Sequence, residues 1–332
     1  MKQFKRVMVT GGAGYVGARL VPKLLDAGYE VTVLDLCLYG AEVLDAVADR
    51  PGFRLVTGDL RDPAAVADAL TGAEAVIHLA CISNDPSFEL DPELGKSINY
   101  DCFRPLVEAA RAAGVRRFVY ASSSSVYGVK AEPNVTEDLP LEPLTDYSRF
   151  KALCEAILAE YTSDEFVTVT LRPATVCGWS PRLRLDLVVN IFCAHAYHRR
   201  AITVHGGSQR RPNIHIEDVT DLYIELLERT DAEVNGRVWN AGWQNLSLDE
   251  IAGTVRGIVG DDVTIINTPT DDLRSYHISS ALIKADLGYE PRRTVEDAIR
   301  DVVTAFGDGR VPDAMSDPRY HNIRTMQNLG MR

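Results

Sequence analysis

Short runs of β-branched and apolar residues alternate with amphipathic segments along the first half of the chain. Within the amphipathic segments apolar residues recur at helical spacing, whereas the short runs are typical of buried strands. We expect strands at residues 6–10, 30–35, 53–57, 75–79, 118–122 and 167–172. We expect helices at residues 15–27, 63–70, 91–113 and 146–162. This rhythm predicts an α/β fold with a doubly wound, parallel, Rossmann-type sheet that is covered by helices on both faces.

The alternation becomes less regular after about Pro173. We expect a helix at residues 183–198 and a strand end followed by a helix across residues 214–227, ahead of a polar C-terminal third. A length of 332 residues is compatible with two domains. The prediction is a Rossmann domain at residues 1–175 and, at residues 176–332, a smaller substrate-binding lobe, some segments of which return to the first domain.

Three glycines directly follow the first expected strand and open the first helix. Gly11 permits a tight turn, Gly14 lets backbone N–H groups approach a pyrophosphate, and Gly17 allows close packing of the helix on the strand. A glycine-rich motif alone is weak evidence, but here it has the strand, turn and helix context that dinucleotide binding requires.

Asp35 ends the second expected strand, about 20 residues beyond the glycines, where a carboxylate accepts hydrogen bonds from an adenosine ribose. A carboxylate at this position repels a 2′-phosphate, and the following residues 36–38 include no Arg or Lys to bind one. NAD is therefore favoured over NADP. Asp59 and Leu60 follow the third expected strand, at the edge where an adenine would lie.

Tyr147 and Lys151 are four residues apart and share one face of an expected helix. An adjacent ammonium stabilises a phenolate, which brings the pKa of a tyrosine toward the range of a general base. Residues 122–125 are four serines at the carboxyl end of the fifth expected strand, where open α/β sheets bind their ligands. A serine hydroxyl there can donate to a substrate oxygen while Tyr147 exchanges its proton.

Composition and charge narrow the class of protein further. The formal net charge of −12 and the absence of a basic run argue against nucleic-acid binding. The six cysteines form no C-x-x-C pair, so we expect neither a metal site nor a redox dithiol. No apolar stretch is long enough for a membrane span, and the chain runs directly into its first strand, so we expect a cytoplasmic protein that does not bind membranes.

With these residues assembled, the chain resembles the extended short-chain dehydrogenases/reductases, in the group of nucleotide-sugar epimerases and dehydratases. The resemblance extends from about Arg6 to Leu287. Its motifs lie at residues 10–17, 35, 58–60, 78–80, 122–128, 147–151, 172–173 and 215–218.

The resemblance assigns roles to individual positions. Ser123, Tyr147 and Lys151 are expected to be catalytic, and Asn99 is expected to support the lysine through water. The expected contacts with NAD are Gly11, Gly14, Tyr15, Val16, Gly17, Asp35, Asp59, Leu60, Leu79, Ala80, Asn99, Tyr147, Lys151, Pro173 and Val176. The expected contacts with the substrate are Ser123, Ser124, Tyr147, Asn190, Arg211 and Arg274, with Arg211 on a diphosphate.

Three positions depart from the pattern of this family. The sugar 4,6-dehydratases carry an Asp-Glu pair directly after the catalytic Thr, where this chain has Ser124 and Ser125. Cys177 replaces a common Tyr and Cys81 a common Ala; we expect packing roles for both, although either thiol is placed to face the cofactor. The second diphosphate arginine of epimerases has no clean match, and Arg274 is the candidate.

The function that these features favour is an NAD-dependent nucleotide-sugar epimerase that acts at carbon 4 through a transient keto sugar. A nucleotide-sugar dehydratase or a ketosugar reductase is the enzymatic alternative, and a non-catalytic NAD-sensing protein is an alternative of another class. The resemblance also implies a homodimer that pairs the helices at residues 91–113 and 146–162 of two subunits.

Overall fold

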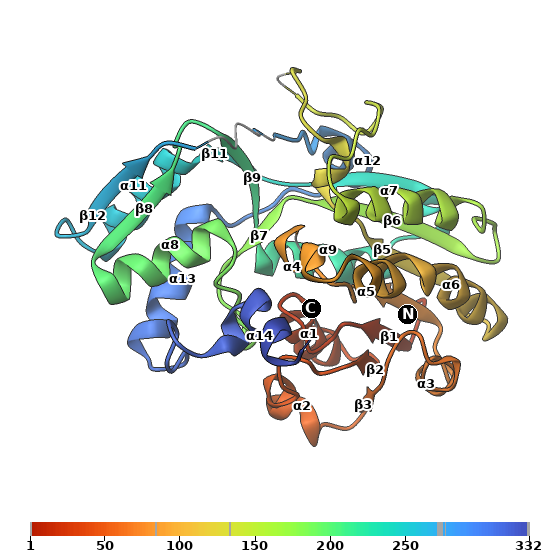
Figure 1. Ribbon diagram of the computed structural model, residues 1–332. Coiled ribbons are helices and arrows are strands. Elements are labelled where there is room, and N and C mark those ends of the chain that lie inside the picture. The colour runs from red at the N-terminus through yellow and green to blue at the C-terminus, as the bar shows by residue number, and fades with distance from the viewer. Residues whose placement is uncertain (1, 84, 133, 271–274, 276, 331–332) are drawn as a thin grey trace.

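The computed structural model describes the chain except residues 1, 84, 133, 271–274, 276 and 331–332, and its centre is a parallel sheet of seven strands in the order β10-β6-β5-β4-β1-β2-β3 (Figure 1). The strands are β1 (Arg6–Thr10), β2 (Glu30–Asp35), β3 (Phe53–Thr57), β4 (Ala75–His78), β5 (Arg117–Ala121), β6 (Val167–Pro173) and β10 (Arg237–Ala241). The predicted α/β Rossmann-type fold is confirmed. The six strands expected from the pattern form with shifts of one residue at some ends.

Helices cover both faces of this sheet, as the buried side chains show. Along β1, Val7 and Val9 pack with α1 (Gly17–Asp26) and α9 (Ile216–Glu228). Met8 between them points to the opposite face and packs with α3 (Pro63–Ala69), α6 (Phe103–Ala112) and α7 (Asp146–Ala159). A parallel sheet that is buried on both sides is the arrangement that near-continuous apolar strands favour.

The helix expected at residues 91–113 is interrupted. The chain forms α5 (Pro92–Lys96), a π-helical turn over Ser97–Asp101 and then α6. Cys102 N bonds to Ser97 O at 3.3 Å, five residues back, and Pro105 has no N–H for the carbonyl of Asp101. The expectation of one continuous helix was therefore wrong at this turn.

The remaining elements build a second part of the molecule, which Figure 1 shows on the left in green to blue. It contains a three-stranded sheet of β7 (Thr175–Cys177), β9 (Arg210–His215) and β11 (Gln244–Ser247), and a parallel pair of β8 (Ala201–His205) and β12 (Thr264–Thr268). Its helices are α8 (Val188–Arg199), α11 (Leu248–Val259), α13 (Val295–Gly307) and α14 (Asn322–Asn328). The short helices elsewhere are α2 (Asp45–Ala48), α4 (Asp85–Leu90), α10 (Asp231–Val234) and α12 (Ala281–Leu287).

The helix expected at residues 183–198 begins only at Val188, because Arg184 and Asp186 of the preceding loop form an ion pair and Leu187 is extended. The seventh strand, β10, was not assigned from the sequence, and it joins the central sheet through parallel pairing with β6. The boundary at residue 175 between the two expected domains remains a prediction.

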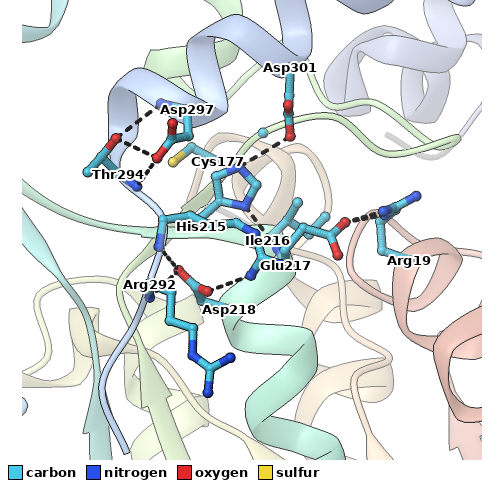
Figure 2. Close-up of polar contacts among 12 residues, drawn as sticks. Arg19, Cys177, His215, Ile216, Glu217, Asp218, Arg292, Thr294, Asp297 and Asp301 are labelled. Carbon is cyan, nitrogen blue, oxygen red and sulfur yellow. Dashed lines mark hydrogen bonds and ion pairs between the residues drawn. The ribbon is translucent and has the colours of Figure 1, made fainter. Parts of the chain in front are cut away.

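The junction of β9 and α9 ties the two parts together, as Figure 2 shows. His215 Nδ1 accepts from Glu217 N at 3.1 Å, and His215 Nε2 lies 3.3 Å from Asp301 Oδ2 on α13. Glu217 pairs with Arg19 on α1, the helix that follows the glycine turn. Asp218 accepts from the backbone N–H of Arg292 at 3.2 Å. This junction therefore fixes the second part of the molecule against α1, the helix that follows the glycine turn.

Candidate active site

The glycine turn after β1 can pack closely on itself and on the loop after β4 only because it lacks side chains. Gly11 has φ of +73°, and a Cβ there would lie 2.7 Å from Ala80 N. A Cβ on Gly14 would lie 3.1 Å from Gly11 O. The backbone thus forms the tight cradle that a pyrophosphate requires at the start of α1.

Asp35 links the end of β2 to this cradle. Its Oδ2 accepts from Ala13 N at 2.9 Å and its Oδ1 accepts from Cys37 N at 2.7 Å. Burial raises the pKa of Asp35, and the two backbone hydrogen bonds oppose that effect. The carboxylate is therefore held rigidly at the wall of the cleft where a ribose would bind.

A cleft of about 220 Å³ runs along the carboxyl ends of the central strands. Every residue that we expected to contact NAD lines this cleft, with the exception of Asn99. The glycine cradle and Asp35 therefore share one cavity with Tyr147 and Lys151, and the residues present fit an NAD molecule.

Asn99 lies beside the cleft and not in its wall. In the π-helical turn its Oδ1 accepts from Ile82 N at 2.8 Å and its Nδ2 donates to Ile82 O at 2.9 Å. Its amide thus holds the loop after β4, and residues 79–83 of that loop line the cleft. The expected support of Lys151 through water stays a prediction.

The two residues of the Tyr-x-x-x-Lys motif sit on the first turns of α7. Thr145 and Ser148 form a capping box that fixes where this helix begins. The buried Lys151 donates from Nζ to Ala121 O at 2.7 Å, and its Nζ lies 5.9 Å from the centroid of the Tyr147 ring. The ammonium therefore lies near the phenol, as the expected role of the pair requires.

A second cleft, of about 370 Å³, adjoins the first, and Tyr147 lines both. Ser123, Ser124 and Arg211 line it as expected of substrate contacts. Ser123 Oγ lies 2.9 Å from Ser125 Oγ and also accepts from Ser125 N at 3.1 Å, so the serine loop is ordered. The phenol therefore stands between the cofactor cleft and a second cavity whose wall includes the serine loop and Arg211.

Of the other two expected substrate contacts, only Asn190 is among the described residues, and it does not line this cleft. Asn190 is fully buried; its Nδ2 donates to Tyr15 Oη and to Arg184 O, and its Oδ1 accepts from Gly178 N. Its amide is used within the protein, so this placement does not support substrate binding. Arg274 lies outside the described residues.

The two cysteines that depart from the family pattern differ in position. Cys177 is fully buried, burial raises the pKa of its thiol, and its Sγ donates to Ile214 O at 3.5 Å. Cys81 is half-buried and lines the cofactor cleft. Cys177 therefore packs in the interior as expected, whereas Cys81 lies in the wall of the cofactor cleft.

The sequence analysis missed polar residues that close the cofactor cleft. The Arg182 guanidinium lies 3.8 Å from the centroid of the Tyr39 ring and donates to Asn322 of α14, and burial lowers the pKa of Arg182 to about 10. Asn322 Nδ2 in turn donates to Ser83 Oγ at 3.1 Å. Because these residues come from four distant segments, no local spacing connects them; the alternation of charged and apolar residues at 182–186 was the only signal.

Among the described residues, no cluster of three or more His, Cys, Asp or Glu side chains is arranged to hold a metal ion. In the same part of the chain no helix has the length and apolar character needed to cross a membrane.

The fold and the site define a class: a dinucleotide-binding enzyme with a tyrosine that lines both clefts and a lysine beside it in the cofactor cleft. Comparison with known proteins agrees. Residues 7–242 match the model of the NAD dependent epimerase/dehydratase family. The chain belongs to this family of NAD-dependent enzymes, which confirms the resemblance seen in its sequence.

Individual relatives match along nearly their whole length. A dTDP-glucose 4,6-dehydratase of Streptomyces niveus is 28% identical, with 92% of this chain and 94% of the relative covered. A UDP-glucose 4-epimerase of Bacillus subtilis is 29% identical, with 89% and 95% covered. Among solved structures, the UDP-glucose 4-epimerase of Thermus thermophilus with NAD is 28% identical in sequence and has a TM-score of 0.80. The match covers 91% of this chain and 99% of that chain.

Proposed function

We propose that the protein is a nucleotide-sugar epimerase that inverts carbon 4 of its sugar. The observation that carries this proposal is the position of Tyr147, which lines both clefts and has the Lys151 ammonium beside it. A phenol in this position removes the proton of a sugar hydroxyl at the point where the carbon meets the nicotinamide.

The residues divide the chemistry among them. Tyr147 takes the hydroxyl proton, Lys151 stabilises the phenolate, and Ser123 donates to the substrate oxygen. NAD, when bound, supplies the acceptor and later the donor of the hydride. The keto sugar turns over between the two transfers, so that the hydride returns to its other face and no net redox change results. Arg211 holds the diphosphate.

Few acidic side chains among the described residues line the substrate cleft, and this favours an epimerase over a dehydratase. Removal of water from C5 and C6 requires an additional acid and base near the sugar, and the positions after Ser123 are Ser124 and Ser125. Among the described residues that line this cleft, the carboxylate is Asp186, and Arg184 pairs with it at 3.0 Å. A nucleotide-sugar dehydratase with other acid and base residues, or a ketosugar reductase, remains the enzymatic alternative. The intact Ser123, Tyr147 and Lys151 argue against a binding-only NAD sensor.

The test is a thermal-shift screen of the NAD-loaded protein with UDP-, GDP-, CDP- and dTDP-sugars, followed by mass and NMR analysis of the products. Unchanged mass with inverted stereochemistry at carbon 4 supports the proposal. Loss of water identifies a dehydratase, and tight NAD binding without turnover of any sugar identifies a sensor.

We also propose that two subunits pair through α6 and α7 in a homodimer, in which their helices form a four-helix bundle. Light scattering at micromolar concentration tests the assembly, and a monomer would contradict it. A cytoplasmic location remains a prediction from the sequence.

A further inference from the structure

Arg184 and Asp186 form an ion pair where the two clefts meet. Arg184 lines both clefts and Asp186 lines the substrate cleft. Arg184 Nε donates to Asp186 Oδ1 at 3.0 Å and its Nη2 donates to Asp186 Oδ2 at 3.1 Å. Asn190 fixes the backbone of the pair by donating to Arg184 O at 3.0 Å. The pair is therefore a built feature of the cleft wall.

Both partners are charged, and together they are neutral. Burial raises the pKa of Asp186, but Arg184 outweighs that effect and holds the pKa below its ordinary value. Burial lowers the pKa of Arg184, but the charge and hydrogen bonds of Asp186 outweigh the effect of burial. The pKa of Arg184 is therefore raised above its ordinary value, and Tyr147 contributes to that increase. Arg184 and Tyr147 both line the two clefts, so the pair and the phenol share the same cavity walls.

The remaining charge in this cleft lies at Arg211 of β9. Among the described residues that line the substrate cleft, the charged side chains are Arg184, Asp186 and Arg211. The side chains of the pair are 13% and 14% exposed, so they face the cavity from a largely water-excluded position. One net positive charge thus suits a diphosphate at Arg211, whereas the Arg184–Asp186 pair itself adds no net charge to the substrate cleft.

The hydrogen-bonding groups of the pair fit a hydroxyl better than a carboxylate. Arg184 Nη1 lies outside the fork with Asp186 and offers donors beside a carboxylate acceptor. A sugar hydroxyl can accept from Nη1 and donate to Asp186. A sugar carboxylate can only accept, and its charge would lie next to that of Asp186 in a site of low dielectric.

We propose that the Arg184–Asp186 pair selects nucleotide sugars with an uncharged sugar and rejects uronic acids. This inference rests on the proposed function, because it assumes that the substrate is a nucleotide sugar. It adds a specificity-determining pair to the site.

The first experiment uses the NAD-loaded wild-type protein with UDP-glucose and UDP-glucuronate. These probes share the nucleotide and differ by a hydroxymethyl group against a carboxylate, so their ratio does not depend on which base is preferred. We expect Kd for UDP-glucose to be lower by about 10²-fold, the effect of a like-charge contact in an excluded site. Equal or tighter binding of UDP-glucuronate would overturn the inference but leave the proposed function standing. Binding of neither probe, nor of any other nucleotide sugar, would overturn both.

The second experiment tests whether Asp186 sets the ratio of the Kd values for UDP-glucose and UDP-glucuronate. Asp186→Asn keeps an oxygen that can accept from Arg184 but removes the negative charge. We expect the preference for UDP-glucose to fall at least about tenfold, since the Arg184 charge becomes available to the uronate. An unchanged ratio in a variant that melts and binds NAD like the wild type would overturn the role of the pair.

The matched control is Asp262→Asn. Asp262 pairs with Arg200 through Arg200 Nε to Asp262 Oδ2 at 2.7 Å, and it is 67% exposed. Neither residue lines the two clefts. The control breaks the same type of ion pair, and we expect the wild-type ratio to persist. Should Asp186→Asn fail to fold, the wild-type ratio still decides the inference.

Discussion

Arg172 of β6 and Glu155 of α7 form an ion pair directly beneath the active site, with Arg172 Nη2 at 2.7 Å from Glu155 Oε2 and side chains that are 7% and 8% exposed. Glu155 also accepts from Ser122, the first residue of the serine loop. On α7, Glu155 follows Lys151 by one turn and Tyr147 by two. The pair thus joins the catalytic helix to the strand ends that carry the serines.

Glu155→Gln should destabilise the protein strongly, because it leaves the Arg172 guanidinium buried without its counter-charge. The expected loss is about 3–5 kcal/mol in the free energy of unfolding. Urea denaturation measures it. Glu160→Gln at the end of the same helix breaks an exposed pair with Arg104 and should leave the midpoint near that of the wild type. Equal midpoints for the two variants would show that the buried pair does not anchor α7.

Tyr147→Phe should abolish proton transfer and leave the cofactor site intact. The change removes only the phenolic oxygen, so NAD binding and folding should persist while turnover falls by about 10²- to 10⁴-fold. Fluorescence titration with NAD and product formation measure the two properties. Tyr161→Phe is the control, because that hydroxyl bonds Glu108 on the surface. Near wild-type turnover of Tyr147→Phe would contradict the mechanism.

Lys151→Ala should reduce both NAD affinity and turnover, whereas Tyr147→Phe should reduce turnover alone. The lysine contacts Ala121 O in the wall of the cofactor cleft and lies beside the phenol, so its loss should weaken NAD binding as well as turnover. The same titration and assay compare the two variants. If NAD affinity were unchanged in Lys151→Ala, the lysine would act only through its effect on Tyr147.

The wild type should bind NAD far more tightly than NADP, because Asp35 would face the 2′-phosphate. Asp35→Ala should reduce the ratio of NAD affinity to NADP affinity. It also removes the hydrogen bonds from Ala13 N and Cys37 N and so weakens NAD binding. Calorimetric titration of both cofactors into both proteins gives the ratio. Equal affinities in the wild type would refute the assignment of Asp35.

Stability should fall below pH 6.5 in a way that depends on His78. Burial lowers the pKa of His78 to about 3, so the folded protein keeps this ring neutral while the unfolded chain binds a proton as pH falls below its ordinary value. The contribution of His78 is therefore fully present above pH 6.5 and is lost at about 1.4 kcal/mol per pH unit between pH 6.5 and 3.

Urea unfolding of the wild type and of His78→Gln between pH 7 and pH 5 measures this difference in slope. The exposed His205→Gln is the matched control, since it removes a histidine without opening the core. Parallel pH profiles for wild type and His78→Gln would contradict the role of burial.

Local spacing was sufficient for much of this protein. The strand and helix periods, the glycine turn at Gly11 and the shared face of Tyr147 and Lys151 each depend on residues only a few positions apart. The fold, the glycine cradle, Asp35 and the Tyr147–Lys151 pair of the cofactor cleft followed from these patterns, and so did the serines of the second cleft. The remaining wall of the cofactor cleft and the placement of Arg211 followed from the family resemblance.

What the sequence alone determined is the local geometry: periodicity and backbone sterics fix which face a residue occupies. The tertiary structure decided which polar groups are used inside the protein. Asn99 and Asn190 bond the backbone of other segments, and Arg182 meets Asn322 across 140 positions. Such pairings depend on how distant segments pack, and packing is a property of the whole fold that no local pattern contains.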